Sequence, residues 1–103
     1  AEAKKTNKPF FVDFYTTWCA PCKLMSKKTF TDAEVGKYAK SKFIAYQIDA
    51  EKGEGISLAN QYKIRAYPTI VFFNAKGEKI GEEIGYKDVD NFLYTLEKYH
   101  KKK

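Results

Sequence analysis

Both cysteines of the chain and its only tryptophan lie in the stretch Trp18-Cys19-Ala20-Pro21-Cys22-Lys23. An apolar run at residues 10–16, typical of a strand, precedes this stretch, and residues 24–28 have a composition typical of a helix. Two thiols two residues apart at a strand-to-helix turn can close a small disulfide ring. The first thiol precedes the helix, where unpaired backbone N–H groups and the helix dipole favour a thiolate. This spacing therefore predicts a redox-active dithiol.

The composition favours one folded domain over residues 1–103. Of the residues, 44% are hydrophobic and 17% aromatic, which is enough to close a core without further disulfides. The net charge is +6, but only Arg65 is an arginine and the lysines are spread along the whole chain. We therefore expect no nucleic-acid partner. No apolar run approaches the roughly 20 residues that a membrane-spanning helix needs.

The hydrophobic periodicity predicts an α/β order of strand, helix, helix, strand, helix, strand, strand, helix. We expect strands at residues 10–16, 43–49, 69–73 and 79–84, and a turn at 74–77 that joins the last two as a hairpin. Helices are expected at 19–28 and at 56–62. A further helix is expected to begin at a capping box, with Thr31 at the N-cap and Glu34 at the third position, and a last helix is expected to begin after an N-cap at Asp88. Residues 1–7 have a helix-forming composition and are expected to be the last turns of a helix that ends before Pro9. Because the chain does not begin with methionine, a leader or further sequence is expected to have been removed.

Four motifs occur in the order Val12-Asp13-Phe14-Tyr15, Trp18-Cys19-Ala20-Pro21-Cys22-Lys23, Arg65-Ala66-Tyr67-Pro68-Thr69 and Gly85. Together they resemble the thioredoxin family. The segments 29–32 and 8–9 resemble a subgroup of bacterial disulfide reductases and isomerases that includes the C-terminal domain of the transmembrane thiol reductant carrier. The resemblance implies a thioredoxin fold, with a central mixed four-stranded sheet flanked by helices. It also implies a cis peptide before Pro68, beside the dithiol, and it slightly favours a periplasmic location over a cytoplasmic one.

The chemistry expected of this family assigns a role to each thiol. Cys19, predicted to be the more exposed sulfur, is the expected nucleophile and attacks a substrate disulfide to form a mixed disulfide. Cys22 then attacks Cys19 and releases the reduced substrate. Asp13 is the expected acceptor of the Cys22 proton, because burial inside an apolar strand raises the pKa of a carboxyl group. The alternative for Asp13 is a carboxylate that faces water at the end of the strand.

Three departures from the usual thioredoxin pattern bear on the chemistry. Many thioredoxins place a lysine near the aspartate, and aligning residues 48–49 leaves Ala45 at that place, so we expect Asp13 to titrate high. The pair Ala20-Pro21 lacks the histidine that stabilises the thiolate in oxidising relatives, which favours a reductase over an oxidase. Tyr67 stands where thioredoxins usually have a small or aliphatic residue.

The remaining site residues are predicted to bind substrate or to support the dithiol. The expected substrate-binding residues are Trp18, Tyr67, Pro68 and Thr69, and the expected supporting residues are Ala20, Pro21, Lys23 and Gly85. Backbone edges at Thr69 and Gly85 are expected to pair with an extended peptide, and the Lys23 side chain is expected to point to solvent. Structural alternatives stay open for Trp18 and for Tyr67, which can be ordinary hydrophobic surface.

No metal or other cofactor is expected. Structural zinc needs four ligands and the two cysteines supply only half of them, while haem attachment needs a histidine at the place of Lys23. The expected partners of a monomeric chain are protein disulfide substrates and an upstream dithiol reductant. The alternative function is a peptide-binding module of the same fold with little redox turnover. Reductase, isomerase and oxidase are not distinguished by the sequence, and neither is the compartment.

Overall fold

The computed structural model describes residues 7–102, so the helical segment predicted at residues 1–7 lies outside the described residues except for Asn7, which is in a turn. The elements are β1 (Phe10–Tyr15), α2 (Ala20–Leu24), the π-helix η1 (Met25–Thr29), α3 (Ala33–Lys42), β2 (Ile44–Asp49), α4 (Glu54–Gln61), β3 (Thr69–Phe73), β4 (Lys79–Ile84) and α5 (Val89–Lys102). Within the described part, no helix is both long enough and apolar enough to cross a membrane.

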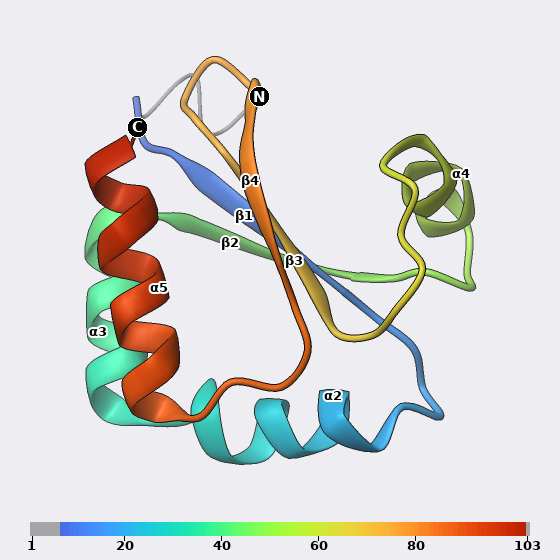
Figure 1. The fold of residues 1–103 in the computed structure, drawn as a ribbon, viewed down its shortest axis with the longest axis horizontal. Coiled ribbons are helices and arrows are strands. Elements are labelled where there is room, and N and C mark those ends of the chain that lie inside the picture. Colours follow the sequence, from blue (N-terminus) through green and yellow to red (C-terminus); the bar gives the residue numbers. More distant parts are fainter. Residues whose placement is uncertain (1–6, 103) are drawn as a thin grey trace.

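The four strands form one mixed sheet, as predicted, and their order in the sheet is β2-β1-β3-β4. Strand β1 runs parallel to β2 and antiparallel to β3, and β4 is antiparallel to β3. Helices α3 and α5 lie side by side on one face of the sheet, α2 lies at its lower end, and α4 lies apart from them (Figure 1). Strand β1 is thus a central strand, which explains why its residues are apolar on both faces.

Alternation along β1 divides the core into two clusters. Phe11 packs with Met25, Phe72 and Phe92 in a cluster beneath α3 and α5, whereas Val12 and Phe14 belong to a second cluster with Ala59 of α4. The predicted apolar stripe of the last helix packs on the first cluster through Val89, Phe92, Leu93, Leu96 and Tyr99. Asp13 lies one residue from Val12 and from Phe14, so it falls on the Phe11 face of the sheet, toward the helices that follow the dithiol.

Some helix boundaries differ from those predicted. The helix expected at 19–28 begins at Ala20 and changes at Met25 into a π-helix, in which the backbone N–H of Phe30 donates to the Met25 carbonyl at 2.9 Å. The N-cap of α3 is Asp32 and not Thr31. The Asp32 carboxylate accepts the N–H groups of Glu34 and Val35, while the Thr31 hydroxyl donates to the Lys27 carbonyl.

Helix α4 begins at Glu54, two residues before the predicted start. Gly53 has a φ of 55°, a left-handed value that turns the chain into the helix. Gly55 then lies so close to the Asp49 carbonyl oxygen that a β-carbon at this position would collide with it. At the other predicted cap, Asp88 accepts the N–H of Asn91 at 2.9 Å, which confirms that expectation.

Candidate active site

Cys19 is the N-cap of α2. Its backbone is extended, with φ −80° and ψ 109°, and its Sγ accepts a hydrogen bond from the Cys22 N–H at 3.1 Å. Pro21 fits the first turn because a backbone N–H there would have no partner within the helix. The sulfur of Cys19 therefore lies where backbone N–H groups can stabilise a negative charge.

Cys19 and Cys22 are joined by a disulfide, with their Cα atoms 5.3 Å apart. In this oxidised state Cys19 is 4% exposed and Cys22 is 7% exposed. The prediction that Cys19 is the more exposed cysteine is therefore wrong for the disulfide form. In this form the Cys19 sulfur is covered by its partners, because it is bonded to the Cys22 sulfur and accepts the Cys22 N–H.

The peptide bond between Tyr67 and Pro68 is cis, as the family resemblance implied. Pro68 is buried, and its carbonyl accepts the N–H of Gly85 at 2.9 Å. Gly85 has a φ of 97°, a backbone conformation that favours glycine at this contact. Gly85 thus ties the end of β4 to the loop before β3.

Thr69 does not offer the free backbone edge that the sequence predicted. It pairs with Phe14 of β1 on one side and with Ile84 of β4 on the other, and its hydroxyl donates to the Ala66 carbonyl at 2.7 Å. Because β3 is an inner strand, neither of its edges is free for a peptide. The Gly85 N–H is likewise occupied, by Pro68. These residues shape the loop beside the site but do not present an unpaired strand edge.

Trp18 connects the dithiol stretch to two other loops. Its side chain is 63% exposed, and its ring meets that of Tyr67 edge-on, with centroids 6.0 Å apart. The indole Nε1–H donates to the Glu51 carboxylate at 2.9 Å. Tyr67 is partly buried against the second core cluster, and it touches the residue that precedes Cys19. Glu51 was missed because the sequence showed only a polar loop there.

Asp13 is 4% exposed, so the alternative of a carboxylate facing water is wrong. Burial raises the pKa of its carboxyl group from 3.8 to about 6, and a hydrogen bond from Gln47 opposes this effect. The Gln47 Nε2 lies 3.5 Å from Asp13 Oδ2, while Oδ1 has no hydrogen-bond partner among the described residues. As predicted, Asp13 titrates high.

The neighbour of Asp13 on β2 is Gln47, a residue that the sequence did not single out. In the parallel register Asp13 pairs with Gln47, whereas Ala45 pairs with Phe11. Aligning residues 48–49 identified the right strand but not the side chain that reaches the carboxylate. The missed signal is the alternation of side chains, which places Ala45 and Gln47 on the same face of β2.

Asp13 and Cys22 line the same cavity, which has a volume of about 360 Å³. Its lining consists of Asp13, Tyr15, Thr16, Thr17, Cys22, Lys23, Ser26 and Gln47. Lys23 is exposed, as expected, yet it also borders this cavity. The arrangement places a buried carboxyl group, whose pKa is raised to about 6, beside the same space as the second cysteine.

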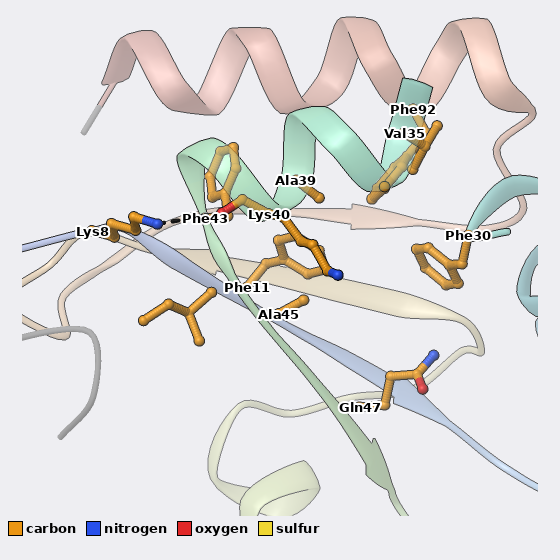
Figure 2. Close-up of a pocket in the computed structure, with 12 residues that line it drawn as sticks. Lys8, Phe11, Phe30, Val35, Ala39, Lys40, Phe43, Ala45, Gln47 and Phe92 are labelled. Atoms are coloured by element: carbon orange, nitrogen blue, oxygen red, sulfur yellow. Dashed lines mark hydrogen bonds between the residues drawn. The ribbon is translucent and has the colours of Figure 1, made fainter. Parts of the chain in front are cut away.

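A larger cavity of about 580 Å³ lies between α3 and the edge of the sheet, with Gln47 at one end and Lys8 at the other (Figure 2). Its phenylalanine floor is formed by core residues such as Phe11 and Phe92, which are at most 3% exposed. Partly buried apolar residues, Phe30, Ala39 and Ile44, also line this cavity. Within residues 7–102, no group of three or more His, Cys, Asp or Glu side chains is placed to hold a metal ion.

A family model described as a thioredoxin-like domain matches residues 1–100. The chain belongs to the thioredoxin-like family. Among curated relatives, it is 31% identical over 98 residues to the thiol:disulfide interchange protein DsbD of Yersinia pestis, a match that covers 92% of this chain. The chain spans only 16% of that relative's length.

Solved structures of the thioredoxin-like family show the same fold. A thioredoxin from Thermus thermophilus superimposes with a TM-score of 0.85 at 24% identity, covering 94% of this chain and 77% of that one. The C-terminal domain of DsbD from Neisseria meningitidis, in its oxidised form, superimposes with a TM-score of 0.76 at 23% identity, covering 94% and 89%. These likenesses confirm the predicted thioredoxin fold and its similarity to the DsbD C-terminal domain.

Proposed function

We propose that this chain is a thiol–disulfide oxidoreductase that reduces or isomerises protein disulfides. The observation that carries the proposal is the Cys19–Cys22 disulfide at the start of a helix, with a buried carboxyl group in the cavity behind Cys22. A purely structural disulfide needs no such acid, because it exchanges no protons. The homology to thiol:disulfide interchange proteins supports the same reaction class.

The reaction begins with the reduced dithiol. The Cys19 thiolate attacks one sulfur of a substrate disulfide, which breaks the substrate S–S bond, forms a Cys19–substrate disulfide and releases the first substrate thiolate. Cys22 then loses its proton to the Asp13 carboxylate and attacks the Cys19 sulfur. This step forms the Cys19–Cys22 disulfide and releases the second substrate thiolate. Two electrons pass from the dithiol to the substrate, and protons return the substrate thiolates to thiols.

A turnover cycle also needs a donor, because the protein ends each reduction as the disulfide. We propose an upstream dithiol that attacks the Cys19–Cys22 bond and restores both thiols. The side chains of Ala20 and Pro21 add no charge or hydrogen-bond donor beside the sulfurs, which supports a reducing role over an oxidising one. Equilibration of Cys19–Cys22 with glutathione measures this preference directly.

Substrate recognition is proposed for the exposed face around the dithiol. Trp18 and Tyr67 form an aromatic pair there, and Pro68 supports the loop that carries Tyr67. The exposed Trp18 ring, next to Cys19 in the chain and supported by the partly buried Tyr67, can hold a segment of a client protein while exchange occurs. Thr69 contributes through the shape of this loop, because its hydroxyl and its backbone are occupied within the fold.

The test is reduction of insulin disulfides by the purified chain with an external dithiol as electron donor. A Cys22→Ser variant should accumulate a covalent adduct through Cys19, because the serine cannot resolve the mixed disulfide. A Cys19→Ser variant is the matched control and should trap nothing. Absence of both insulin reduction and the adduct would instead support a thioredoxin-fold module that binds peptides without redox turnover.

A further inference from the structure

Gln47 is the one described side chain that hydrogen-bonds to the Asp13 carboxylate. The pairing of β1 with β2 places the two residues directly opposite each other in the sheet. At 3.5 Å the contact is longer than the roughly 2.7–3.2 Å of an ordinary N–H···O hydrogen bond, so it has a weak effect on the carboxylate. The donor is a neutral amide, which stabilises a negative charge less than a cation would.

Gln47 also lies beside Asp13 along the cavity behind the dithiol. Its side chain is exposed, yet it borders the 360 Å³ cavity that Asp13 shares with Cys22. It also borders the larger cavity, where it lies at the end far from Lys8 (Figure 2). Gln47 therefore stands at the mouth of the space behind the dithiol, between buried Asp13 and solvent.

Among the groups around Asp13, Gln47 is the side chain that affects the pKa of the carboxyl group through a hydrogen bond. Tyr15 of β1 and Cys22 and Lys23 of α2 are the titratable side chains that line the shared cavity, and Ser26 of η1 is neutral. On β3, the residue paired with Asp13 is the apolar Ile70. Burial and the Gln47 hydrogen bond are the two causes of the altered Asp13 titration, and the exposed lysine is not one of them.

We propose that Gln47 is a positioning residue for disulfide exchange, which holds Asp13 by donating its side-chain amide N–H to Oδ2 at the mouth of the cavity shared with Cys22. This role rests on the proposed function, in which Asp13 accepts the Cys22 proton. The amide stabilises the ionised, proton-accepting form of Asp13 without adding a charge. Burial remains the larger influence on the pKa of Asp13, and the amide opposes it, so Gln47 extends toward lower pH the range over which Asp13 can accept the Cys22 proton.

Two substitutions at Gln47 should move Asp13 in opposite directions. Gln47→Met keeps the length of the side chain but removes the donor, so the pH midpoint of Asp13 should rise by about half a pH unit. Gln47→Lys places a cation at the same site and should lower the midpoint. Because Gln47 is exposed on an edge strand, both variants should fold like the wild type. Gln61→Met, at the other glutamine of the chain and on the exposed surface of α4, is the matched control and should leave the midpoint unchanged.

The first measurement is the titration of the Asp13 side-chain carboxyl carbon by NMR in the oxidised protein, which requires no turnover. The second is the rate of insulin reduction against pH. A midpoint half a pH unit higher should make Gln47→Met about twofold slower than wild type at pH 6, and the rates should converge by pH 8. A structural defect alone would lower the rate at both pH values.

Midpoints that coincide with wild type in both variants, or that move in the same direction, would overturn the role of Gln47. Failure of the wild type to reduce insulin would refute the proposed oxidoreductase instead. In that case the NMR titration still decides whether Gln47 controls Asp13. The two ideas are therefore tested separately.

Discussion

Replacing Asp13 with asparagine should stabilise the protein at neutral pH while it slows disulfide exchange. The wild-type carboxyl group binds its proton more tightly in the folded state, where burial raises its pKa from 3.8 to about 6. The folded state therefore holds more protons than the unfolded state between these values, and the free energy of unfolding decreases as pH rises through this window. The difference corresponds to about 3 kcal/mol above pH 6.

Asparagine has nearly the same size as aspartate and remains neutral at every pH, so the Asp13→Asn variant lacks this cost. Urea unfolding of both proteins at pH 4 and at pH 7 measures the effect. The stability advantage of the variant should increase by roughly 2–3 kcal/mol between the two pH values. The other carboxyl groups are common to both proteins and cancel in the comparison.

The same substitution removes the proposed proton acceptor of Cys22. Resolution of the mixed disulfide should slow by on the order of 100-fold, the lower end of the usual contribution of a general base. A stability difference that stays constant from pH 4 to pH 7 would show that Asp13 carries no burial cost. Unchanged resolution at pH 7 would show that Asp13 does not take the proton.

Two further predictions concern the fold. Gly55→Ala should destabilise the protein by roughly 1–3 kcal/mol in thermal unfolding, because the new β-carbon would collide with the Asp49 carbonyl oxygen. Gly36→Ala, at an open position of α3, is the control and should stabilise the protein by up to about 1 kcal/mol. Equal effects of the two substitutions would refute the packing argument. Glu83→Gln should reduce stability at pH 7 but have less effect in acid. Burial opposes the ionisation of Glu83, but hydrogen bonds from Tyr99 and two lysines outweigh burial and lower the pKa of Glu83 below 4.5. The stability that ionised Glu83 contributes is therefore lost as the pH falls. Urea unfolding at pH 7 and below pH 4 tests this prediction, and a stability loss in Glu83→Gln that is as large in acid as at pH 7 would contradict it.

Much of the architecture was predictable because it depends on short-range sequence features. Two cysteines separated by two residues can form a disulfide without help from distant segments, and the strands and helices follow from the periodicity of apolar residues. The cis peptide before Pro68 required the family resemblance, since only about 5–6% of X-Pro bonds in folded proteins are cis. The cap of α3 was misplaced by one residue because Thr31 and Asp32 both suit an N-cap, and only the three-dimensional contacts show that the Asp32 carboxylate receives the N–H groups.

The sequence by itself determined that this chain carries an exchangeable dithiol at the start of a helix, and that a carboxyl group lies in the strand before it. The tertiary structure decided which side chains surround these groups: Gln47 opposite Asp13, Glu51 on Trp18, and strands on both sides of Thr69. Spacing and periodicity are properties of neighbouring residues. Register and burial arise only when separate segments of the chain pack together, as the pairing of β1 with β2 brings Gln47 to Asp13.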